Sequence, residues 1–173
     1  SARKFPTALT SLFGRKSPIT KWFPNNSITK NEFSCFDSNG KVIEVDWVSG
    51  ACMIVRRKAF ESVGGFDEKL FLYWEDADLC KRLKDRGWRI VYHPKVRIRH
   101  FVGRSSNTRP LASICHFHHS CYKYFAKHAH GWRKLFKPIS FWGLSFRCLF
   151  VILLNMIKSQ LEVRIKSINN KKP

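Results

Sequence analysis

The chain has 173 residues, with 32 Lys and Arg against 12 Asp and Glu, and a formal net charge of +20. This length supports one hydrophobic core, with or without an appendage, and excludes an array of several full-sized domains. The charge is far larger than solubility requires, so it predicts an anionic partner: a phosphate-bearing substrate, a nucleic acid or the anionic surface of a membrane.

The first hundred residues predict an α/β layer in which strands and helices alternate. Residues 1–41 are interrupted by prolines and turn-forming residues and favour irregular structure. Two helices should end at Gly64-Gly65 and at Gly87, because glycine adopts the left-handed cap at low cost. The expected order is a strand over 42–48, a buried strand over 51–55, a helix over 57–63, a helix over 77–86, a strand over 88–92 and a candidate strand over 96–100.

Beyond residue 110 the pattern becomes helical, with expected helices over 111–128 and 158–168. Between them, residues 139–157 form an apolar stretch of 19 residues in which Arg147 carries the only charge. This length just suffices to cross a bilayer, but Arg147 and Asn155 make a spanning helix expensive. Three alternatives stay open: an in-plane interfacial anchor, which the aromatic residues and basic flanks favour, a buried core helix and a true membrane span.

The six cysteines show neither a CxxC pair nor the spacing of a small disulfide scaffold. No signal peptide is recognisable at the start, which predicts reduced, mostly buried thiols in a cytosolic setting. The chain begins at Ser1 rather than at Met, so we expect a piece of a longer polypeptide.

Five of the 12 acidic residues fall within residues 67–78, beside Phe71, Tyr73 and Trp74. Like charges packed together raise each other's pKa, so stability alone rarely favours such a cluster. Carboxylates among aromatic residues suit a catalytic base or a ligand for a metal or hydroxyl groups. The alternative is a solvated acidic helix start, where the carboxylates interact favourably with the helix dipole.

Four motifs occur in a fixed order: VDWVSGA at 45–51, RR at 56–57, GGFDE at 64–68 and YWEDADL at 73–79. Together they resemble the C-terminal half of the catalytic domain of family 2 inverting glycosyltransferases, especially bacterial rhamnosyltransferase-like members. The resemblance covers about residues 1–130. It implies a partial GT-A (nucleotide-diphospho-sugar transferase) α/β fold, followed by C-terminal helices. No Asp-x-Asp follows an early strand, so the fold is expected to lack its N-terminal nucleotide-binding half.

The resemblance implies a glycosyltransferase fragment that transfers a sugar, with rhamnose favoured, from a nucleotide-diphospho-sugar to a glycan or lipid-linked acceptor with inversion. It also implies a divalent metal, Mn²⁺ or Mg²⁺, and a role in bacterial cell-surface polysaccharide synthesis. We expect residues 1–130 to be the acceptor-side half of the catalytic domain and residues 131–173 to be a basic, apolar helical tail that associates with membrane. The expected location is the cytoplasmic face of the inner membrane, peripheral or anchored.

The resemblance places Asp76 on the catalytic base position, where it would take the proton of the attacking hydroxyl. Glu75 would bind or orient the acceptor, and His100 would help to hold the metal with the diphosphate, although a lone histidine is often structural. Asp78 has an alternative role as a helix cap. The other expected substrate-binding residues are Asp46, Trp47, Ser49, Gly50, Tyr73, Trp74, Arg104, Ser105 and Ser106.

The chemistry of each residue suggests its role. Tyr73 and Trp74 offer faces for sugar stacking, and Ser49-Gly50 either lets a ligand approach the backbone or forms a plain tight turn. Asp46 either accepts hydrogen bonds from sugar hydroxyls or pairs with Arg56 or Arg57. In the loop at 104–106, guanidinium and hydroxyl groups suit the oxygens of the leaving diphosphate.

Three other interpretations compete with this one. The Cys115–Cys121 segment, with three histidines, invites a zinc site, but a closed site needs ligands from two segments, so helix packing is favoured. The charge and the aromatic residues also fit a nucleic-acid-binding module. The carboxylate cluster speaks against a nucleic-acid groove, and we expect no nucleic acid partner. A membrane adaptor without catalysis would explain the tail but not the Trp-Glu-Asp segment.

Overall fold

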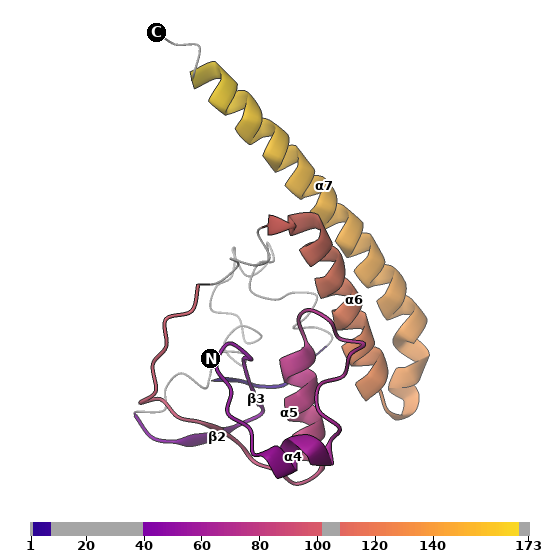
Figure 1. Ribbon diagram of the computed structural model, residues 1–173. Helices are drawn as coiled ribbons and strands as arrows, with labels where there is room; N and C mark the ends of the chain where they lie inside the picture. Colours follow the sequence, from indigo (N-terminus) through magenta and orange to yellow (C-terminus); the bar gives the residue numbers. More distant parts are fainter. Residues whose placement is uncertain (1, 8–39, 102–107, 170–173) are drawn as a thin grey trace.

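The computed structural model describes residues 2–7, 40–101 and 108–169. A small unit of short strands and two helices lies on one side, and two long helices lie on the other (Figure 1). The elements are β1 (Ala2–Arg3), β2 (Ile43–Val45), β3 (Trp47–Val48), α4 (Arg57–Ser62), α5 (Glu75–Asp85), β4 (Ile90–Tyr92), α6 (Pro110–His128), the 3-10 helix η2 (Gly131–Phe136) and α7 (Lys137–Asn169).

The strands form two antiparallel pairs, β1 with β3 and β2 with β4. The strand expected over 42–48 is therefore two short strands, because a bend at Asp46 separates the part that pairs with β4 from the part that pairs with β1. The strand expected over 88–92 is confirmed in its last three residues, which form β4. The combination of helices and strands confirms a mixed fold, as the sequence predicted.

The strands expected over 51–55 and 96–100 are wrong, since neither segment forms a ladder with another described segment. Ile54 is 98% exposed, and Val96 and Ile98 are 61% and 52% exposed. An apolar run becomes a strand only where a partner strand satisfies its backbone groups, and local sequence does not reveal that partner.

Helix α5 forms the centre of the core. Its buried face carries Leu79, Cys80 and Leu83, which pack with Val45 of β2 and Ile90 of β4. The helix begins two residues earlier than expected and ends before Gly87, which has a φ of 81°. This position holds the first turn of α5, with its acidic residues, at the edge of the core.

Helix α4 confirms the helix expected over 57–63, apart from its last residue. Gly64 and Gly65 follow with φ of 73° each, so the left-handed glycine cap is confirmed. Arg82 of α5 donates a hydrogen bond from Nη1 to the carbonyl oxygen of Val63 at 2.7 Å. This bond ties the end of α4 to α5.

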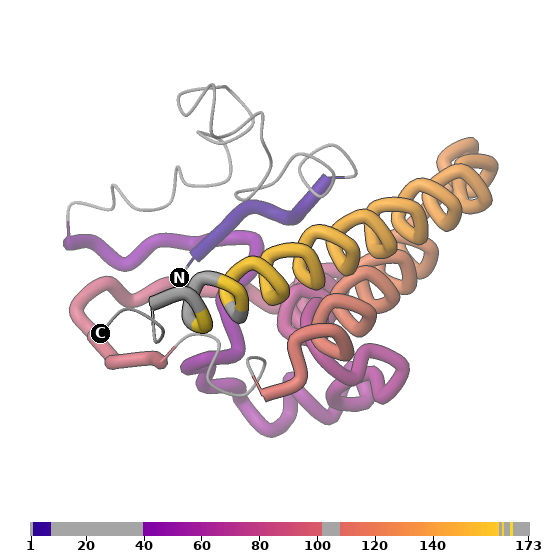
Figure 2. The backbone as a smooth tube through the Cα atoms, turned by 90° about the horizontal axis from the view of Figure 1, so that it is seen from above, coloured from indigo at the N-terminus to yellow at the C-terminus, as the bar shows by residue number. Residues whose placement is uncertain are grey.

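Helices α6 and α7 run side by side as a hairpin joined by η2 (Figure 2). The helix expected over 111–128 is confirmed as α6. The apolar stretch and the helix expected over 158–168 form one continuous helix, α7, because no glycine or proline interrupts them after Gly143.

Gly131–Glu162 is long and apolar enough to cross a membrane by length and composition, with a mean hydropathy of 1.7 in its apolar window. Only 6% of that window is buried. The alternative of an ordinary buried core helix is therefore wrong. The interfacial anchor and the span remain.

Candidate functional site

A strained turn brings the chain into α5. Tyr73 and Trp74 have φ of 66° and 71°, which bulky side chains rarely adopt. Such strain persists only where the surrounding structure enforces it, and it concentrates at functional sites. The turn places Glu75 and Asp76 in the first turn of α5, where the helix dipole favours carboxylates.

Asp76 joins two of the sequence motifs. Its Oδ2 accepts a hydrogen bond from the backbone N–H of Gly50 at 2.9 Å, and its Oδ1 accepts one from the N–H of Ala77 at 2.8 Å. Each carboxylate oxygen retains a further lone pair for a hydroxyl. The segment around Gly50 and the segment around Asp76 therefore meet at one carboxylate.

The close approach expected at Ser49-Gly50 is an approach to Asp76. A Cβ added to Gly50 would lie 3.5 Å from the Cβ of Asp76, which is ordinary contact. Ser49 accepts a long hydrogen bond at Oγ from the N–H of Ala51 at 3.4 Å, which shapes the local turn. Gly50 therefore contacts the site through its backbone N–H, which donates to Asp76.

Glu75 is half-buried, and its Oε2 has no hydrogen-bond partner among the described residues. Burial raises the pKa of Glu75 above its ordinary value, and the nearby charge of Asp76 raises it further. The indole Nε1 of Trp74 is also buried without a described partner. Within the described residues, the turn thus holds one acceptor and one donor without a hydrogen-bond partner next to Asp76. Burying such atoms costs free energy of folding, and a ligand that bonded to them would remove this cost.

An aromatic wall on α6 holds the strained turn. The ring of Trp74 lies 5.9 Å from Phe117, 5.2 Å from Tyr124 and 5.5 Å from Phe125, between centroids. Tyr73 contacts the edge of Phe117 at 5.6 Å. Aromatic packing of this kind stabilises the folded chain and so opposes the strain of the turn.

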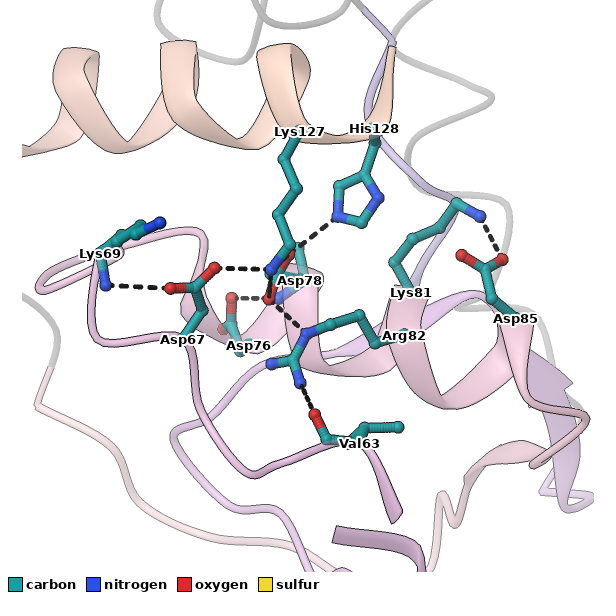
Figure 3. A network of polar contacts seen from close by, with 11 residues as sticks. Val63, Asp67, Lys69, Asp76, Asp78, Lys81, Arg82, Asp85, Lys127 and His128 are labelled. Atoms are coloured by element: carbon teal, nitrogen blue, oxygen red, sulfur yellow. Dashed lines mark hydrogen bonds and ion pairs between the residues drawn. The ribbon is translucent and has the colours of Figure 1, made fainter. Parts of the chain in front are cut away.

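Asp78 is fully buried at the interface of α5 and α6 (Figure 3). Its carboxylate accepts hydrogen bonds from Arg82 Nε at 2.7 Å, Lys127 Nζ at 3.0 Å and His128 Nε2 at 2.8 Å. Lys127 Nζ also contacts Asp67 Oδ2 at 2.6 Å. Burial alone would raise the pKa of Asp78, but the bonds from His128, Lys127 and Arg82 outweigh it and lower the pKa to about 2.

These contacts correct the alternative role of Asp78 as a helix cap. Trp74 occupies the N-cap position of α5 without a side-chain cap bond, and Asp78 points toward α6 instead. Sequence reasoning missed Lys127 and His128 altogether. They lie about fifty residues beyond Asp78 in the chain, and their only local signal is their basic character in the last turn of α6.

Asp46 and Trp47 hold the N-terminal strand. Asp46 accepts a hydrogen bond from the N–H of Phe5 at 2.9 Å and pairs with Lys84 Nζ at 2.9 Å. Trp47 Nε1 donates to the carbonyl oxygen of Lys4 at 2.9 Å. The alternative pairing of Asp46 with an arginine of the RR motif is wrong, because Lys84 on α5 lies closer in the fold.

His100 is exposed at the end of the irregular segment that follows β4. The described residues contain no group of three or more His, Cys, Asp or Glu placed to hold a metal ion. His100 can thus supply one imidazole to a metal but lacks further ligands from the described part of the chain. Arg104, Ser105 and Ser106 lie outside the described residues.

The histidine-rich part of α6 is used for packing. Both ring nitrogens of His118 are engaged, Nδ1 with the carbonyl oxygen of Ile114 at 2.8 Å and Nε2 with Arg147 Nη1 of α7 at 3.3 Å. Cys121 is buried, and no disulfide joins the five cysteines within the described residues. The zinc reading is wrong for His118, since no ring nitrogen remains for a metal.

Comparison with known proteins gives a consistent result for the first part of the chain. Residues 29–113 match the sequence profile described as "Glycosyltransferase like family 2". The chain is similar to the N-acetylglucosaminyl-diphospho-decaprenol L-rhamnosyltransferase of Mycobacterium tuberculosis, with 43% identity over 88 residues, covering 51% of this chain and 29% of that protein. No solved structure matches the chain.

Two further relatives carry related names. Rhamnosyltransferase WbbL of Escherichia coli K12 is 45% identical over 58 residues, 34% of this chain and 22% of that protein. The O-antigen biosynthesis protein RfbC of Myxococcus xanthus is 43% identical over 90 residues, 52% of this chain and 6% of that protein. The chain thus spans less than a third of the length of these relatives.

We predict that Asp78→Ala lowers the free energy of unfolding by about 3–5 kcal/mol, because it leaves buried cationic donors without their carboxylate. Asp85→Ala is the matched control, since it removes a partly exposed pair with Lys81 on the same helix and should cost about 1 kcal/mol or less. Urea denaturation followed by circular dichroism measures both. Equal losses for the two variants would contradict the anchoring role of Asp78.

The same carboxylate predicts an acid transition. Its pKa is lowered from 3.8 to about 2 in the folded chain, so its stabilisation is complete above the unfolded value. That stabilisation should be lost as the pH falls from about 4 to about 2. Acid unfolding of the Asp78→Ala chain should depend less steeply on pH across this interval, and an unchanged slope would reject the assignment.

We predict that Glu75→Gln stabilises the chain at pH 7. A carboxyl whose folded pKa is raised favours the folded state only while protonated, so stability is lost as the pH rises above the ordinary value of 4.5. A neutral amide is cheaper to bury than a charge. The melting temperature of the variant should exceed that of the parent at pH 7 and match it near pH 4; a lower value at pH 7 would contradict this account.

Proposed function

We propose, from the match of residues 29–113 to the family 2 glycosyltransferase profile, that the whole protein transfers a sugar from a nucleotide-diphospho-sugar donor to a glycan or lipid-linked acceptor with inversion. Rhamnose is the proposed sugar, because two of the similar proteins are named rhamnosyltransferases. The observation that carries the proposal is the hydrogen bond from Gly50 to Asp76, which joins two motifs of the resemblance at one carboxylate. The proposed setting is bacterial cell-surface polysaccharide synthesis.

The proposed reaction is a single displacement at the anomeric carbon of the donor sugar. The acceptor oxygen forms the new bond on one face as the bond to the diphosphate breaks on the other, which inverts the configuration. Asp76 takes the hydroxyl proton during the attack, and the diphosphate leaves with the bonding electron pair. The N–H groups of Gly50 and Ala77 hold the carboxylate of Asp76 in one orientation for that transfer.

The residues around Asp76 have proposed roles in binding. The unpartnered Oε2 of Glu75 is suited to accept a hydrogen bond from an acceptor hydroxyl. Tyr73 is half-exposed and retains one side of its ring for sugar stacking, while the ring of Trp74 is largely committed to α6. The proposed substrate contacts of Ser49, and of Asp46 and Trp47 beyond their bonds to the N-terminal strand, follow from the resemblance.

The proposed fold is a partial GT-A fold that lacks the nucleotide-binding half. Residues 1–130 would be its acceptor-side half, and residues 131–173 would be a membrane-associating tail. The mixed helix and strand structure and the partial coverage of the relatives support this division. Divalent Mn²⁺ or Mg²⁺ is the proposed cofactor, with His100 as one ligand and the diphosphate contacted by residues 104–106.

The proposed location is the cytoplasmic face of the inner membrane, peripheral or anchored. Two observations support a membrane. The helix Gly131–Glu162 is apolar and largely exposed. The M. tuberculosis relative has a decaprenol-linked compound in its name, which suggests a lipid-linked acceptor for this protein too.

We predict that Asp76→Asn lowers turnover of the full-length enzyme by about 10²- to 10⁴-fold, the usual contribution of a general base. Donor binding should stay near that of the parent, because the amide keeps the shape of the carboxylate. Asp85→Asn, on the last turn of the same helix, should leave turnover unchanged. Sugar transfer and donor binding are measured on all three proteins, and near-parental turnover of Asp76→Asn would reject the base assignment.

We predict that His100→Ala weakens metal-dependent donor use without unfolding the domain, because an exposed imidazole contributes little to packing. Raising the manganese concentration should restore part of the activity by mass action. His93→Ala is the matched control, since His93 is exposed on the same segment and has no proposed ligand role. A destabilised His100→Ala protein with an unchanged metal profile would end the ligand proposal.

A further inference from the structure

One face of α7 is apolar and exposed along most of its length. Trp142, Phe146 and Leu149 are 71%, 73% and 67% exposed, and Leu153 and Ile157 are 54% and 48% exposed. These residues recur every three or four positions and therefore form a single stripe on the helix. An exposed apolar stripe of this extent is a contact surface for another apolar phase or for a protein.

The opposite face of α7 is held by α6. Leu144 is buried, and Phe141 contacts Tyr122 with ring centroids 5.3 Å apart. Arg147, the one charged residue of the apolar stretch, donates to His118 of α6. The charge of Arg147, which makes a spanning helix expensive, therefore lies at the helix interface and not on the stripe.

Helix α6 is in turn bound to the candidate active-site segment, from which it cannot separate without losing buried polar contacts. Lys123 Nζ donates to the carbonyl oxygen of Lys69 at 3.1 Å, and Lys127 and His128 bind Asp78. A spanning α7 would carry α6 and these charged side chains into the hydrocarbon, where each lysine is expensive. The contacts of α6 with α7 and with the Asp78 segment therefore oppose a membrane-spanning position of α7.

We propose that α7 lies in the plane of an anionic membrane surface, with its apolar stripe in the lipid and its other face on α6. The inference deepens the proposed membrane location and rests on it. Charge identifies the lipid as the occupant. Arg133, Lys134 and Lys137 precede the stripe and Lys158 follows it, and basic residues near an anionic surface are attracted to it. Two copies of a chain with a net charge of +20 would instead repel each other.

The neighbouring 3-10 helix extends the same surface. Trp132 of η2 is 68% exposed and Leu135 is 77% exposed, next to the basic residues of that turn. Tryptophan and basic residues together favour the boundary between headgroups and acyl chains. The position of η2 at the start of α7 places this anchor at one end of the stripe.

The first test measures binding of the 173-residue chain to vesicles of phosphatidylglycerol and phosphatidylcholine, and to vesicles of phosphatidylcholine alone. Binding should require the anionic lipid and should weaken as salt is raised. Phe146→Gln should weaken it by about tenfold or more, because a buried aromatic ring is lost from the lipid. Phe101→Gln is the matched control, with the same change at an exposed phenylalanine outside α7, and should leave binding unchanged.

The second test separates an in-plane helix from a span. The chain with a C-terminal tag is reconstituted from detergent into the anionic vesicles, and trypsin is added outside. In-plane binding puts the exposed Lys95, Arg97 and Arg99 on the same side of the bilayer as the tag, so both are cleaved or both are protected in each vesicle. Cleavage on one side only would overturn the in-plane arrangement in favour of a span, while leaving the proposed membrane location intact.

Two other outcomes would also overturn the inference. Absence of binding to anionic vesicles, or equal binding of Phe146→Gln and the parent, would show that the stripe does not face lipid. Dimerisation that Phe146→Gln abolishes, without vesicle binding, would identify a second copy as the occupant. None of these outcomes concerns sugar transfer, which the Asp76→Asn and Asp85→Asn comparison tests separately.

Discussion

The carboxylate of Asp78 has no solvent exposure and accepts hydrogen bonds from three side chains, two of which belong to α6. Because the first turn of α5 carries Asp78 together with Glu75 and Asp76, the position of α6 fixes the position of the site. The aromatic wall on α6 acts at the same interface, through the ring of Trp74. The site therefore depends on a long-range contact between two helices rather than on the strands alone.

The strained turn before α5 lowers the stability of the fold at the candidate site. Left-handed backbone at two bulky residues and a half-buried carboxylate without a described partner both oppose folding. They persist because the burial of Trp74 against α6 and the ion pairs of Asp78 outweigh them. Unsatisfied polar groups held in this way are ready to bind a ligand, since binding removes a cost that folding has left.

Sequence predicted the helices well and the strands poorly, for a physical reason. Helix ends at Gly64-Gly65 and Gly87 are local signals, whereas the pairing of β2 with β4 joins segments about forty-five residues apart. The same distinction applies to the site. The sequence places Asp76 and Gly50 in two motifs of one family but does not predict the hydrogen bond between them. The contacts of Lys127 and His128 with Asp78 have no local sequence signal that identifies their partner. Local secondary-structure propensity does not predict which distant residues a charged side chain will contact.

The carboxylates of the acidic cluster fall into two groups, those that form ion pairs and those that do not. Asp67 and Asp78 pair with Lys127, and Asp78 pairs with Arg82 and His128 as well, so these carboxylates serve the fold. Among the described residues, no ion pair reaches Glu75 or Asp76. In a chain of net charge +20, the described part of the fold thus keeps these two carboxylates out of ion pairs. A base must be able to accept a proton, and a carboxylate bound to a lysine or arginine is a weaker base, so the separation of the two kinds of carboxylate is what the proposed chemistry requires.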